Sequence, residues 1–196
     1  MYKFVAATAL ALVLAAACTD DPPLATNAPA PESAVNVNTP PPAAAPAPAK
    51  PAPANILTLE GLGPLRIGQP VPANSGWAER GAQISDECRL VSNPDVPGVY
   101  AIVEEGRVRR ITLGERATIR LAEGIGVGAS EADVRAAFAG FREEPHTYVE
   151  APGKYLTAPN AASGDAALRF EIGADRRVSL VHVGTMPVLG YVEGCA

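Results

Sequence analysis

The chain has 196 residues and carries 21 acidic against 16 basic side chains, which gives a formal net charge of −5. Nucleic-acid binding usually requires a concentration of Lys and Arg, so this balance argues against a nucleic-acid partner. The 20 prolines are unevenly distributed. The distribution of proline and the hydropathy of the sequence together indicate a leader at 1–18, a linker at 19–55 and one expected folded domain at 56–196.

The leader has the layout of a secretory signal. Lys3 supplies a positive charge, residues 4–14 are apolar except for Thr8, and three alanines precede Cys18. The apolar run is too short to span a hydrocarbon core of ~30 Å. One interpretation is a plain signal peptide in which Cys18 has no role.

The end of the leader, LAAAC at 14–18, resembles the lipobox of bacterial lipoproteins. The resemblance implies that the Cys18 thiol receives a diacylglycerol, so that membrane lipid is the first expected partner. The family prefers Leu three places before the cysteine, where this chain has Ala15. Thr19 rather than Asp follows Cys18, which in that family implies the outer rather than the inner membrane. We therefore expect a cell-envelope protein that faces the periplasm.

The linker holds 11 of the 20 prolines, separated mainly by Ala, Asn and Thr. Without large apolar side chains it cannot bury enough surface to fold, and we expect a disordered segment. A polyproline-like spacer of this length reaches roughly 100 Å at ~3.1 Å per residue. A passive spacer is our main interpretation, and a ligand for a proline-recognising partner is the alternative.

The domain alternates short apolar runs with turn residues, which favours an α+β fold with mainly antiparallel sheet and one or two helices. The clearest hairpin surrounds Glu105-Gly106, and a short helix is possible around Trp77. Ser130 and Asp133 form a capping-box pattern that predicts a helix ending at Gly140. The hairpin covers 99–113, and further strands are expected at 56–59, 65–67, 88–91, 117–121, 146–150, 154–158, 167–173, 177–184 and 190–195.

Residues 61–121 and 122–196 look like two copies of one unit, in which Gly68 corresponds to Gly128 and Val108 to Val178. Each unit would be a glycine turn, a helix and a hairpin. This pattern resembles the tandem helix-plus-sheet modules of beta-lactamase-inhibitor-protein-like and SmpA/OmlA outer-membrane assembly lipoprotein folds. Prolines at 70 and 72 replace the first helix cap, so that helix is expected to be short or absent. The chain also resembles exported alphaproteobacterial proteins that end in Glu-Gly-Cys.

Two cysteines remain once Cys18 is set aside. In an exported protein, Cys88 and Cys195 are expected to form a disulfide. The alternative is one buried free thiol and one free thiol at the end of the chain.

The motifs that carry chemistry are weak. The glycines at 124–128 lack the third glycine of a dinucleotide fingerprint, where Ala129 stands, so no cofactor is expected. His146 and His182, the two histidines, do not form a metal-ligand pattern. His146, Tyr148 and Tyr155 flank a polar Pro-Gly loop, and we take them as the candidate binding surface.

These features predict a lipid-anchored periplasmic or outer-membrane binding or interaction module without catalytic residues. Its partner would be an envelope protein or peptidoglycan. The alternative is an envelope enzyme, such as a hydrolase, whose site is assembled from residues distant in the sequence.

Overall fold

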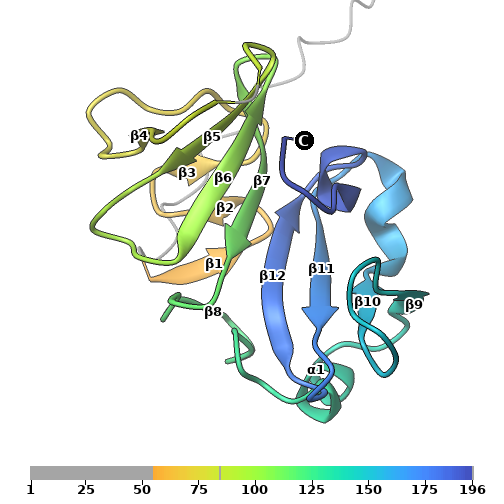
Figure 1. Cartoon of the computed structure of the whole chain (residues 1–196). Coiled ribbons are helices and arrows are strands. Elements are labelled where there is room, and N and C mark those ends of the chain that lie inside the picture. The colour runs from red at the N-terminus through yellow and green to blue at the C-terminus, as the bar shows by residue number, and fades with distance from the viewer. Residues whose placement is uncertain (1–54, 84, 196) are drawn as a thin grey trace, which may run out of the picture. The chain divides into compact units, whose positions relative to one another are not determined.

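The computed structural model describes residues 55–83 and 85–195 (Figure 1). The predicted leader, lipid anchor at Cys18 and linker up to residue 54 lie outside the described residues. Within the described ranges, no helix is long and apolar enough to cross a bilayer.

The domain is built on an eight-stranded antiparallel sheet. Four strands from the first half of the chain and four from the second meet where β7 pairs with β12, with Ile111 opposite Val183. Figure 1 shows the two groups of strands side by side. In order across the sheet, the strands are β4 (Ala78–Glu79), β5 (Cys88–Ser92), β6 (Val99–Glu104), β7 (Arg107–Leu113), β12 (Val178–Gly184), β11 (Ala167–Ile172), β10 (Lys154–Thr157) and β9 (Arg142–Pro145).

A smaller four-stranded sheet and one helix complete the domain. The small sheet contains the parallel pairing of β1 with β8. Leu57 and Leu62 from this sheet join Val134 of the helix and the inner side chains of the large sheet in one apolar core. The elements are β1 (Ile56–Thr58), β2 (Gly61–Leu62), β3 (Leu65–Arg66), β8 (Arg120–Leu121), α1 (Glu131–Ala137), and the 3₁₀ helices η1 (Pro159–Ser163) and η2 (Val188–Gly190).

The helix begins where the sequence predicts. The Ser130 hydroxyl accepts the backbone N–H of Asp133 at 3.1 Å, and the Asp133 carboxylate accepts the backbone N–H of Ser130 at 3.1 Å. This capping box satisfies two backbone donors at the helix end. Just after the helix, Phe138 packs against Phe170 of β11 with ring centroids 5.7 Å apart, which fixes α1 on the sheet.

Side chains of the large sheet divide into two faces because alternate residues of a strand point to opposite sides. One face holds the apolar core, including Ile111, Phe170 and Val181. The residues between them in the strands, such as Thr112 and His182, are also buried although they are polar. We call this second side the polar face.

The α+β class, the antiparallel sheet and a single helix agree with the sequence prediction. The helix expected around Trp77 is absent, because this segment forms turns before β4 while Trp77 itself packs into the core. Segments 146–150 and 190–195 are not strands. They form a loop and the end of the chain, and both contact the polar face instead of pairing at a sheet edge.

Tandem helix-hairpin units are not shown, since the described part of the first half contains no helix. Pro70 and Pro72 occupy the positions where its helix would begin. The glycine turns of the two halves nevertheless make equivalent backbone hydrogen bonds to their strands. The Gly68 N–H donates to the Val108 carbonyl at 2.7 Å, and the Gly128 N–H donates to the Val178 carbonyl at 2.8 Å.

Candidate functional site

Strand register brings polar residues from four strands into one row on the polar face. Thr112 of β7 lies opposite His182 of β12, which lies opposite Arg169 of β11. Two residues further along, Glu171 of β11 lies opposite Tyr155 of β10. These residues are up to 70 positions apart in the sequence, and only the strand pairing makes them neighbours.

A continuous hydrogen-bond chain runs through this row. Thr112 Oγ1 lies 2.9 Å from His182 Nδ1, and His182 Nε2 lies 3.0 Å from Glu171 Oε1. The second carboxylate oxygen, Glu171 Oε2, lies 3.1 Å from Nε2 of His146. One carboxylate therefore joins the two histidines of the described chain.

The hydrogen bonds assign the proton positions on His146. Its Nδ1 accepts the backbone N–H groups of Tyr148 at 3.1 Å and of Val149 at 3.2 Å. Because Nδ1 accepts, the ring proton lies on Nε2 and is donated to Glu171. The same contacts fix the start of the loop at 146–153, so that His146 joins this loop to the polar face.

His182 is held in its neutral form. Burial lowers the pKa of His182, and the positive charges of Arg110 and Arg169 act in the same direction, against the hydrogen bond to Glu171. In the neutral ring, Nε2–H donates to Glu171 while Nδ1 accepts the Thr112 hydroxyl. His182 therefore acts in the row as a neutral hydrogen-bond donor and acceptor at neutral pH.

Glu171 is the charged member of the chain. Burial alone would raise the pKa of Glu171, but the hydrogen bonds from His182 and His146 outweigh it and lower that pKa. The carboxylate is therefore ionised at neutral pH and accepts two imidazole N–H groups. Removing either donor would leave part of a buried charge without a partner.

Tyr155 fills the space beside this chain. Its ring stacks on His146 with centroids 4.5 Å apart, and the guanidinium carbon of Arg169 lies 4.1 Å from the Tyr155 ring centroid. Arg169 also lies 3.4 Å from a carboxylate oxygen of Glu144 on β9. A cation over an aromatic face is favourable, and more so when it is shielded from water. Packing therefore immobilises Tyr155 on both sides.

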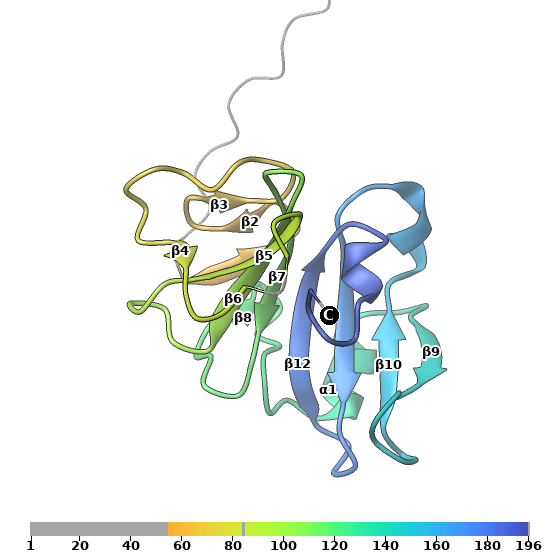
Figure 2. The same cartoon turned by 45° about the horizontal axis from the view of Figure 1, so that its top comes forward.

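The C-terminal segment covers another part of the polar face. It follows β12, and Figure 2 shows it in front of β12 and β11. The buried Arg110 guanidinium donates to the carbonyls of Val188, at 3.1 Å, and of Tyr191. A disulfide joins Cys195 to Cys88 of β5, with the Cα atoms 5.6 Å apart. The predicted pairing of these two cysteines is confirmed.

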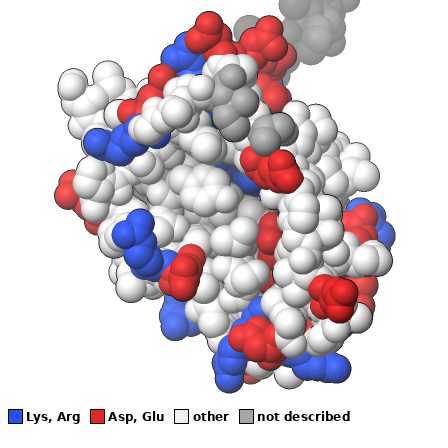
Figure 3. Space-filling model, in the orientation of Figure 1, with Lys and Arg blue, Asp and Glu red and all other residues white. Residues whose placement is uncertain are grey.

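The loop and the C-terminal segment meet at an exposed junction. The Tyr148 hydroxyl donates to the Glu193 carboxylate across a gap of 45 residues in the sequence. Tyr148 is 62% exposed and Val192 is 41% exposed, the two largest apolar exposures in this region. In the space-filling view, uncharged atoms fill most of the centre and charged side chains lie mainly at the rim (Figure 3).

The three residues predicted as a binding surface are brought together, but they are not equally accessible. The side chain of His146 is 7% exposed and Tyr155 is 3% exposed, so both lie inside the polar network. Of the three, only Tyr148 is presented to solvent. Sequence reasoning missed Thr112 and Glu171. Each of them stands between two apolar residues in its strand, and this alternation is the sequence signal that could have identified them.

The Thr112–His182–Glu171 chain has the connectivity of a hydrolase triad, in which a hydroxyl, an imidazole and a carboxylate are joined in series. A nucleophile must reach the substrate, however, and Thr112 is 0% exposed. Among residues 55–83 and 85–195, no three His, Cys, Asp or Glu side chains are grouped closely enough to hold a metal ion.

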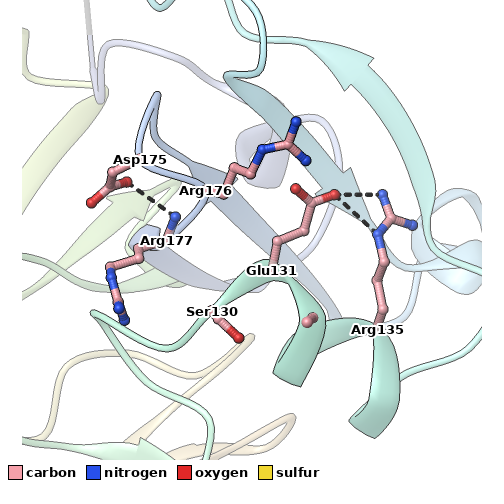
Figure 4. A pocket seen from close by; sticks show the side chains of 7 residues that line it. Ser130, Glu131, Arg135, Asp175, Arg176 and Arg177 are labelled. Carbon is pink, nitrogen blue, oxygen red and sulfur yellow. Dashed lines mark hydrogen bonds and ion pairs between the residues drawn. The ribbon is translucent and has the colours of Figure 1, made fainter.

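A separate pocket lies between the start of α1 and the β11–β12 turn (Figure 4). Glu131 Oε1 accepts from Arg135 at 2.8 Å and from Lys154 at 3.0 Å, while its buried Oε2 has no partner. Asp175 accepts the backbone N–H of Arg177 at 3.0 Å. The contact of Glu131 with Lys154 joins the helix to β10, and charges of both signs line the pocket.

The chain matches no protein-family model, and comparisons with curated proteins and with solved structures also find no match. The resemblances to lipoprotein signals and to the helix-plus-sheet modules therefore stay predictions.

Proposed function

We propose that the protein is a lipid-anchored interaction module of the cell envelope. The observation that carries the proposal is the use of its three cysteines. Two of them, Cys88 and Cys195, form a disulfide, and such bonds persist in oxidising compartments such as the periplasm. The third, Cys18, stands at the end of an export-type leader, where acylation would use its thiol.

In this proposal the chain works as anchor, spacer and folded head. Acylated Cys18 holds the protein in the outer membrane, facing the periplasm, and several acyl chains make the attachment stable. The linker at 19–55 keeps the head at a distance from the lipid. Residues 61–121 and 122–196 are diverged copies of one unit whose first helix has been lost. The matching hydrogen bonds of Gly68 and Gly128 support that origin.

The proposed contact surface is the junction of Tyr148 and Val192 on the rim of the polar face. Exposed aromatic side chains on loops fixed by a rigid scaffold are frequent in binding sites. His146 and the disulfide fix the two segments that present these residues. An envelope protein or peptidoglycan is the partner that this location would offer.

The anchor is tested by fractionating cells that express the wild-type chain and a Cys18→Ala variant. We expect the wild-type chain in the outer membrane, labelled by radioactive palmitate, and the variant unlabelled and released. Thr19→Asp is the matched sorting control and should move the labelled protein to the inner membrane. Retention of Cys18→Ala in the membrane fraction would show that the anchor lies elsewhere.

The contact surface is tested by placing a photocrosslinking amino acid at Tyr148 in intact cells. A control places the same group at Glu115, an exposed residue that follows β7. A discrete crosslinked product from position 148 alone supports the proposed surface. Identical products from both positions, or none, would contradict it.

An envelope hydrolase is the second candidate, favoured by the connectivity of Thr112, His182 and Glu171. Its test is hydrolysis of a panel of activated esters by the wild-type chain and by Thr112→Val. A triad hydrolase would lose about 10³-fold or more in rate on losing its nucleophile. Equal background rates for both proteins would remove this candidate.

A further inference from the structure

An apolar groove of about 400 Å³ lies between the small sheet and the elements that cover the second half of the large sheet. Its floor is buried and comes from both halves of the chain, for example Leu57 of β1 and Leu168 of β11. The groove is lined by Leu57, Thr58, Leu59, Glu60, Leu121, Ala122, Glu123, Phe138, Phe141, Ala158, Pro159, Asn160 and Leu168.

The walls of the groove are aromatic and aliphatic. Phe138 and Phe141 are half-buried, with ring centroids 5.6 Å apart, and Leu59, which is 41% exposed, lines the same groove. Proline-rich segments bind grooves lined by aromatic side chains, because an extended polyproline chain loses little entropy when it docks.

The ionisable side chains that line the groove are all acidic. Its two ionisable lining residues are Glu60 and Glu123, and both are exposed. Residues 19–55 contain a single basic residue, Lys50, which stands in the run PAPAKPAPA at 46–54. This segment therefore combines the chemistry that the groove would accept, namely prolines and small apolar side chains around one positive charge.

We propose that residues 46–54, which lie outside the described residues, dock in this groove of the same chain with Lys50 beside Glu60 and Glu123. The described chain begins at Asn55, directly before β1, and the residues that follow β1 line the groove. Three residues of strand span roughly 10 Å. Nine residues of polyproline span roughly 28 Å. The segment is long enough to turn at Asn55 and return along the groove.

Docking would set the reach of the linker. With residues 46–54 bound, the extended length available between membrane and head falls by roughly 28 Å out of roughly 100 Å. Release would restore that length without any change in the folded head. The docking itself does not depend on acylation of Cys18, whereas its effect on the reach from the membrane rests on the proposed anchor.

The test is intramolecular photocrosslinking of the full-length protein in detergent. A photoreactive amino acid replaces Ala52, and a control chain carries it at Ala34. We expect crosslinks from position 52 to peptides containing 57–60, 121–123, 138–141 or 158–160, and none of these from position 34. Mixing isotopically heavy and light chains separates contacts within one chain from contacts between copies.

A charge exchange then tests the pairing. Glu60→Lys with Glu123→Lys should lower the crosslink yield at least two- to five-fold, the effect expected for exposed ion pairs of 0.5–1 kcal/mol. Adding Lys50→Glu should restore the yield. Leu59→Ser should also lower it, and because Leu59 is exposed this variant should keep its disulfide and unfolding midpoint. Crosslinks outside the groove, crosslinks only between copies, or no response to charge reversal would each overturn the proposal.

Discussion

Removing the disulfide should destabilise the domain by an amount set by the length of the loop that it closes. Cys88 and Cys195 are 107 positions apart. Chain entropy alone gives about 4.7 kcal/mol for a loop of ~100 residues. With a urea m-value of about 2 kcal/mol/M, the unfolding midpoint should fall by about 2 M. The perturbation is Cys88→Ala with Cys195→Ala, or the wild-type chain in reductant.

The assay is equilibrium urea unfolding followed by circular dichroism, with every chain in the same detergent. Reductant should lower the midpoint of the wild-type chain and leave that of the double variant unchanged. Cys18→Ala is the matched cysteine control and should keep the wild-type midpoint. Equal midpoints for the wild-type chain with and without reductant would refute the reasoning, since the loop would then add nothing to stability.

Three further predictions follow from the network, the cap and the core. The pKa of His182 is lowered in the folded state, so on acidification the unfolded chain, in which this histidine has a pKa near 6.5, binds the proton before the folded chain does. The urea midpoint should therefore fall as the pH drops below about 6.5. His182→Gln should flatten this dependence of the midpoint on pH, and an unchanged dependence would contradict the assignment of a neutral His182. Ser130→Ala should cost about 1 kcal/mol by loss of the helix cap, whereas Ser163→Ala, outside α1, should cost less; equal losses in thermal unfolding would count against the cap. Phe170→Ala should cost about 3–5 kcal/mol because Phe170 is fully buried, and a loss below about 1 kcal/mol in urea unfolding would show that it does not anchor α1.

The local elements could be predicted because their causes lie within a few residues. Glu105 and Gly106 both adopt positive φ, 52° and 71°, as the turn between two β-branched runs requires. The Ser130–Asp133 pattern is a capping box in the structure as in the sequence. Segment 146–150 misled the prediction, because its apolar and aromatic residues suit a strand whereas its backbone N–H groups bind His146.

The sequence by itself determined the antiparallel character of the domain, the position of its helix and the pairing of Cys88 with Cys195. Turn chemistry, helix caps and cysteine number are local or compositional signals. Only the tertiary structure decided that β7 pairs with β12, and with it that Thr112 meets His182 and Glu171. Contacts between residues far apart in the chain depend on register across strands, and a one-residue slip would have turned these side chains to the other face.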